Sequence, residues 1–187
     1  MPHNEAHEIS RRWIAKGDRC NRATVDAAFD RFFSYFVAYN ALYFIAAAKA
    51  RSNSEDAKAH QGGDMSASTK GVPNYLGADR LWAKLEETCK PSIEALREGL
   101  LNSRFSVSTD RTTGEVDPEH DKELASKIAN ADPAIRCTAL LTVIYYVRCN
   151  MFHSGKLPTH IQKEPLDHVS LVLRQTATYL SSRLDAA

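Results

Sequence analysis

The sequence lacks the features of a membrane or secreted protein. It contains no run of about 18 uncharged apolar residues, and its first residues show no basic segment followed by an apolar one. It also lacks an excess of either charge, because 24 Lys and Arg face 23 Asp and Glu. A polycationic surface is therefore excluded, and nucleic-acid binding would depend on a local patch. We expect a cytoplasmic protein without membrane contact.

Cysteine is scarce, and metal-binding patterns are missing. The four cysteines show no CxxC spacing, so we expect reduced thiols rather than a disulfide framework or a zinc site. His153, His160 and His168 are seven and eight residues apart, which matches no common ligand motif. The sequence therefore predicts neither a metal nor a cofactor.

Helical periodicity is the main pattern in the sequence. With 187 residues, 43% of them hydrophobic, the chain fits a single domain over residues 1–187. Convincing alternating strands and internal repeats are both absent. We therefore expect an all-α bundle of about four to six main helices. Apolar residues at three- and four-residue steps predict these helices over residues 24–50, 79–90, 91–101, 119–130, 134–153 and from 165 onward.

The connecting segments are also predicted from composition. Residues 51–73 are rich in Ser, Asn, Asp, Gly and Lys, which favours a long flexible loop. Apolar and polar residues alternate only weakly over residues 105–118, which is compatible with either a short hairpin or an irregular segment. Pro91 and Pro165 are each predicted to begin a helix, so that residues 79–90 and the segment after Pro91 form a bent pair.

A permanent cation interrupts the apolar stripe of the helix over 134–153. At about 100° per residue, Arg148 lies near the middle of a face that also holds Leu141 and Ile144. An unpaired buried guanidinium costs several kcal/mol, so a carboxylate, a phosphate or a wet cleft should meet it. A structural ion pair with Glu94 or Asp30 is the simplest alternative to a functional role.

His153 follows Arg148 near the predicted end of this helix. Five residues separate the two side chains by about 140° and about 7.5 Å on an ideal helix, so they meet only if the helix loosens after His153 or a second subunit contributes. An imidazole can move a proton to or from a ribose oxygen while a guanidinium braces the phosphate, without a metal. Asn150, Ser154 and Lys156 are candidate contacts for the phosphate.

Residues 148–156 (RCNMFHSGK) resemble the Arg-x4–6-His signature of HEPN domains, often written Arg-Asn-x-x-Phe-His-Gly-Gly-Lys. Residues 29–44, rich in Phe and Tyr, resemble the first long helix of that family. The order of the two segments agrees with the family's arrangement. Cys149 departs from the pattern, in which Asn, Asp or His commonly follows the arginine. Ser154 replaces the first glycine.

The resemblance implies a helical bundle that forms a homodimer in which the two motifs meet. It also implies, for many members, a metal-independent endoribonuclease with a toxin or antiviral-defence role and an antitoxin or regulatory partner. Arg148 and His153 match the catalytic pair, and Asn150, Ser154 and Lys156 match its neighbours. Asn40 could face the same cleft or be a core amide. A non-catalytic module that dimerises or binds nucleotide or RNA is the alternative function.

Overall fold

The computed structural model describes residues 3–20, 24–52, 63–110, 113, 115–153 and 160–185. The predicted all-α fold is confirmed, because the only β feature in this part of the chain is an isolated bridge between Thr109 and Val116. No helix in it is long and apolar enough to cross a bilayer. The longer helices are α1 (His3–Arg19), α2 (Val25–Ser52), α5 (Ala78–Leu101), α6 (Pro118–Ile128), α7 (Pro133–His153) and α8 (His160–Asp185).

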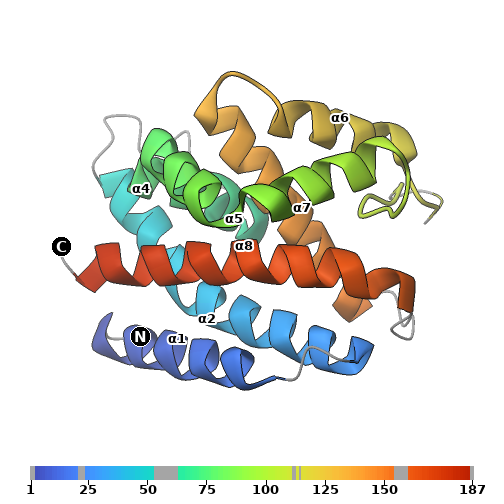
Figure 1. The fold of residues 1–187 in the computed structure, drawn as a ribbon. Coiled ribbons are helices and arrows are strands. Elements are labelled where there is room, and N and C mark those ends of the chain that lie inside the picture. Colours follow the sequence, from blue (N-terminus) through green and yellow to red (C-terminus); the bar gives the residue numbers. More distant parts are fainter. Residues whose placement is uncertain are drawn as a thin grey trace.

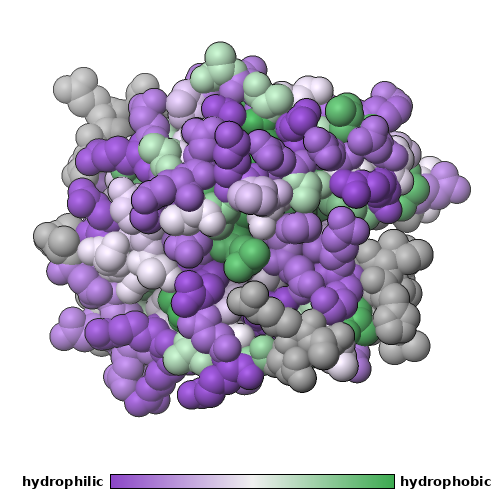
Figure 2. All heavy atoms as spheres, viewed as in Figure 1, coloured by the Kyte–Doolittle hydropathy of each residue, from purple (hydrophilic) through white to green (hydrophobic). Residues whose placement is uncertain are grey.

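The helices pack around α8 and α2 (Figure 1). In this view α8 crosses the molecule in front of α2 and α7, with α1 on one side and α5 on the other. α2 packs against both α1 and α8, and α5 packs against α8, α6 and α7. The face of the molecule drawn in Figure 2 is mainly hydrophilic, with a small hydrophobic area over α8.

The predicted apolar stripes form the core. α2 buries large aromatic side chains along its length, including Phe32, Tyr35 and Tyr39. The stripe predicted for the last helix is buried throughout; its members are Leu166, Val169, Leu173, Ala177, Leu180 and Leu184. Burial of such side chains is the main favourable contribution to folding. The core therefore follows the predicted periodicity except at Phe44 and Leu101, two residues of the predicted stripes that are 51% and 44% exposed.

Side-chain caps fix the starts of three helices. The Thr24 hydroxyl accepts a hydrogen bond from the Ala27 amide at 3.1 Å, where α2 begins. Asp117 accepts from the amide of His120 at 3.0 Å before α6, and Asp132 accepts from the amide of Ala134 at 2.8 Å before α7. These contacts satisfy amides that have no partner within the helix.

The prediction of a flexible loop over residues 51–73 is wrong for its second half. The chain is helical through α3 (Asp64–Ser66), the π-helical turn η1 (Ala67–Gly71) and α4 (Val72–Leu76). Ala67, Val72 and Leu76 are buried, and η1 and α4 pack against α2. Residues 53–62 lie outside the described part of the chain. The polar composition of the whole segment obscured its short apolar helical part.

Both prolines expected to begin helices lie inside them. Pro91 is within α5 and Pro165 is within α8, which begins at His160. The predicted bent pair is therefore one helix in the structure. Cys89, Ile93 and Leu96 continue a single buried face across Pro91, and this packing outweighs the backbone hydrogen bond that a proline cannot donate.

Candidate functional site

Arg148 lies near two aromatic rings towards the end of α7. Its guanidinium carbon is 5.5 Å from the centre of the Phe36 ring on α2 and 5.8 Å from that of Tyr145. The side chain is half-buried. Among the described residues, no ion pair joins it to Glu94 or Asp30, the carboxylates considered from the sequence. The rings provide apolar packing and a negative π face for the cation.

A carboxylate and two phenols lie beside this arginine. The Asp64 carboxylate, at the start of α3, accepts hydrogen bonds from the hydroxyl of Tyr43 on α2 and, at 3.0 Å, from that of Tyr145 on α7. Three segments far apart in the sequence are thereby connected at one point. Both phenols donate to the same side chain, so each of the two hydroxyls has an acceptor.

Burial and the Asp64 contact both keep these phenols protonated. Burial, followed by the hydrogen bond to Asp64, raises the pKa of Tyr43 well above its usual value. The same two causes, in the same order, raise the pKa of Tyr145 to about 12. The positive charge of Arg148 acts in the opposite direction on both hydroxyls. The two tyrosines are therefore hydrogen-bond donors at neutral pH.

Asn40 is exposed on α2, so it is not the buried core amide that the sequence left open. It lies one helical turn after Phe36 and one turn before Phe44, which places it on the side of α2 that Arg148 contacts. The Phe44 ring is 51% exposed and packs on Tyr43 with ring centres 4.6 Å apart. Next to it, Phe44, Ile45, Ala48, Lys49 and Ser52 line a hollow of about 380 Å³.

The remaining predicted residues lie at or beyond the end of α7. His153 is the last residue of that helix, and its side chain is outside the described part of the structure. Ser154 and Lys156 are outside the described residues altogether. The Asn150 amide donates to the Val107 carbonyl oxygen at 2.9 Å, so it holds residues 105–109 against α7. The structure thus brings Arg148 and Asn40 to one side of the molecule.

The sequence-based prediction of the site did not include Asp64, Tyr43 or Tyr145. Asp64 is in the segment predicted to be a loop, and the two tyrosines belong to the apolar stripes of core helices. A polar hydroxyl at the end of an otherwise core-like side chain is the one signal that was present, since buried phenols require a hydrogen-bond partner.

A second polar group lies between α6 and α7. His120 Nδ1 is 3.2 Å from a Glu123 carboxylate oxygen, and its Nε2 is 3.4 Å from the Tyr146 hydroxyl. These contacts border a mainly apolar hollow of about 430 Å³. Within the described ranges, no group of three or more His, Cys, Asp or Glu side chains is close enough to hold a metal ion.

The comparisons with known proteins give no match. This holds for protein-family models, for curated proteins and for solved structures.

Proposed function

We propose that this protein is a metal-independent endoribonuclease of the HEPN type that acts in the cytoplasm as a homodimer. The observation that supports the proposal is the placement of Arg148. A half-buried guanidinium held by two aromatic rings, five residues before the end of its helix at His153, suits the binding of a phosphate at that helix end.

The reaction follows from the two side chains. One imidazole takes the proton of a ribose 2′-hydroxyl, and that oxygen attacks the adjacent phosphorus while the bond to the 5′-oxygen breaks. The leaving oxygen receives a proton from an imidazolium, and Arg148 stabilises the charge that builds on the phosphoryl oxygens. The products are a 2′,3′-cyclic phosphate and a 5′-hydroxyl. His153 of each subunit supplies the proton transfers in this proposal, with Ser154, Lys156 and Asn40 as RNA contacts.

The test is RNA cleavage by the purified protein in the presence of a chelator. We expect cyclic-phosphate ends with the wild type and a loss of at least a hundredfold with His153→Ala, the usual contribution of general acid–base catalysis. Arg148→Lys should also lose activity, because an ammonium lacks the planar pair of N–H donors with which a guanidinium binds a phosphate. Arg183→Ala, which removes an exposed arginine of α8, is the matched control and should cleave normally. Intact RNA with the wild type rejects the proposal.

A toxin or defence role, with an antitoxin or regulatory partner, belongs to the same proposal. Growth arrest on expression of the wild type, relieved by His153→Ala, is the expected result. Equal growth of both strains contradicts this role.

The second candidate is a non-catalytic module that dimerises or binds RNA or nucleotide. The contact that favours it is the 3.9 Å hydrogen bond from Arg148 Nη1 to the sulfur of Cys149, the residue that departs from the family pattern. A thiol is a weak hydrogen-bond partner and orients the guanidinium less firmly than an amide or carboxylate. For this function, Arg148→Ala should weaken dimerisation or RNA binding while the wild type shows no cleavage.

A further inference from the structure

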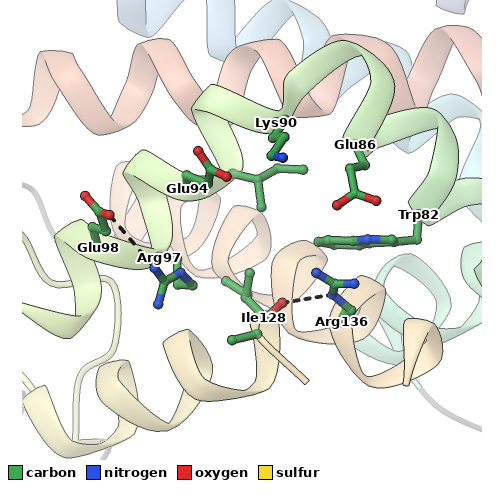
Figure 3. A pocket seen from close by; sticks show the side chains of 10 residues that line it. Trp82, Glu86, Lys90, Glu94, Arg97, Glu98, Ile128 and Arg136 are labelled. Atoms are coloured by element: carbon green, nitrogen blue, oxygen red, sulfur yellow. Dashed lines mark hydrogen bonds and ion pairs between the residues drawn. The ribbon is translucent and has the colours of Figure 1, made fainter. Parts of the chain in front are cut away.

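A cleft between α5 and the junction of α6 with α7 has the features of a small-molecule site (Figure 3). Its volume is about 460 Å³, which is within the usual range for ligand pockets. Ile93 and Ile128 supply an apolar surface, and both are buried. None of its lining residues belongs to the Arg148 site, so the inference is independent of the proposed function.

Charged groups of both signs line the cleft in equal number. Arg97 and Glu98 form a long ion pair of 3.9 Å. Three further side chains on α5 have no hydrogen-bond or ion-pair partner in the part of the chain that the structure describes; they are Glu86, Lys90 and Glu94. These three residues follow one another at four-residue steps, so a cation lies between two anions along one helix face.

Trp82 closes one end of the cleft with an unsatisfied donor. The side chain is only 5% exposed, and its indole N–H has no acceptor within the described residues. Arg136 stacks over the ring with its guanidinium carbon 4.0 Å from the centre, and its Nε donates to the Ile128 carbonyl at 3.2 Å. Figure 3 shows the ring edge-on between Glu86 and Arg136. A buried N–H without an acceptor costs about 1–3 kcal/mol, which a bound acceptor would offset.

We infer that this cleft binds a zwitterionic small molecule, an α-amino acid with an apolar side chain. Its carboxylate would accept from Lys90 and from the Trp82 indole, and its ammonium would donate to Glu86 or Glu94. Its side chain would cover Ile93 and Ile128. A simple anion would meet three carboxylates, and a simple cation would meet Lys90 and Arg136, so only a ligand with both charges satisfies the lining.

Tryptophan fluorescence reports on the site directly. In a Trp13→Phe background, Trp82 is the only tryptophan, because the chain contains two. L-leucine, L-methionine and L-phenylalanine are titrated to millimolar concentration, with calorimetry on the wild type in parallel. We expect a saturable signal with at least one of them. Isopentylamine and 4-methylpentanoate, which are leucine without its carboxylate and without its ammonium, should each bind about tenfold more weakly.

Single charge removals identify the residues responsible. Glu86→Gln and Lys90→Met should each weaken binding about tenfold, whereas Glu87→Gln, which alters the neighbouring carboxylate paired with Lys84, should not. Glu86→Gln and Lys90→Met change exposed side chains, so thermal melting should show an intact core. Trp82→Phe removes the indole N–H, and calorimetry should then show weaker binding. Absence of a saturable signal with all three amino acids, binding of 4-methylpentanoate equal to that of leucine, or equal weakening by Glu87→Gln overturns the inference.

Discussion

At the scale of single residues, the tyrosines determine how this protein should respond to alkaline pH. Burial, followed by a hydrogen bond to Asp18, raises the pKa of Tyr35 to about 12, and burial with the Asp64 contact does the same for Tyr145. In the unfolded chain both hydroxyls titrate near their ordinary value of about 10. The unfolded state therefore loses these protons at lower pH than the folded state does.

This difference in pKa between the folded and the unfolded state determines how stability changes with pH. The stability contributed by Tyr35 and Tyr145 is complete below about pH 10 and is lost as pH rises towards about 12. We expect urea denaturation to show a falling free energy of unfolding over this interval. Tyr145→Phe should make the fall smaller, since one of the shifted groups is removed. A stability that is constant between about pH 9 and about pH 11 would contradict the assignment.

The cysteines should differ in reactivity for a related reason. Burial raises the pKa of the Cys137 thiol to about 12 and also raises that of Cys89, so little nucleophilic thiolate forms at either position. Cys20 is half-exposed near the end of α1. In the native protein, a thiol reagent should label Cys20 faster than Cys89 and Cys137, as mass spectrometry of peptides measures. If Cys89 and Cys137 were labelled at the same rate in the native and the unfolded protein, burial would not protect these two thiols.

At the scale of elements, close packing explains why residues 64–76 are helical although their composition is that of a loop. A methyl group added at Gly71 would lie 2.6 Å from the Cβ and 3.1 Å from the Cα of Ala47. The absence of a side chain at Gly71 thus lets η1 approach α2 closely. Glycine usually indicates a turn, but here its use is steric, which a single sequence does not reveal.

Gly71→Ala tests this contact. The added methyl group must displace η1 or α2, and we expect a loss of about 1–3 kcal/mol in the free energy of unfolding, the usual cost of overpacking. Gly63→Ala is the matched control, since a methyl group there meets nothing within 4 Å. Urea denaturation of the two variants gives the difference. If Gly71→Ala is as stable as Gly63→Ala, the contact between η1 and α2 is not tight.

The accuracy of the sequence-based predictions also differs between elements. The predicted starts of the helices over residues 24–50 and 134–153 agree with the structure, in which Thr24 and Asp132 cap α2 and α7, because capping depends on the next few residues only. Pro91 and Pro165 misled the prediction because their helices continue through packing against distant elements. Local chemistry was readable from the sequence, whereas the outcome of tertiary packing was not.

At the scale of the whole molecule, contacts between distant residues assemble both the bundle and the candidate site. Asp18 accepts from Arg174 Nε at 2.6 Å and from the Tyr35 hydroxyl at 2.7 Å, which joins the end of α1 to α2 and α8. Asp64 joins α2 and α7 through two tyrosines in the same way. Such pairings have no periodic signature, so the sequence identified Arg148 but not the groups around it.

For the proposed homodimer, we predict that the second subunit covers Phe44 on α2. A phenylalanine that is 51% exposed is unfavourable in water, and Phe44 is on the same side of α2 as Asn40. If two motifs meet in a homodimer, Phe44 should become buried between the subunits. Phe44→Ser removes this apolar surface while Tyr43 and Asp64 keep their hydrogen bond.

We therefore expect Phe44→Ser to sediment as a monomer at concentrations where the wild type is a dimer, and to lose RNA cleavage in parallel. Leu171→Ser, which removes an apolar side chain 37% exposed on α8, is the matched control and should remain dimeric. Loss of cleavage without loss of the dimer would show that Phe44 contacts RNA rather than a second subunit. A dimer disrupted by Leu171→Ser but not by Phe44→Ser would place the interface on α8, and a catalytic site shared through the Arg148 side would then be excluded.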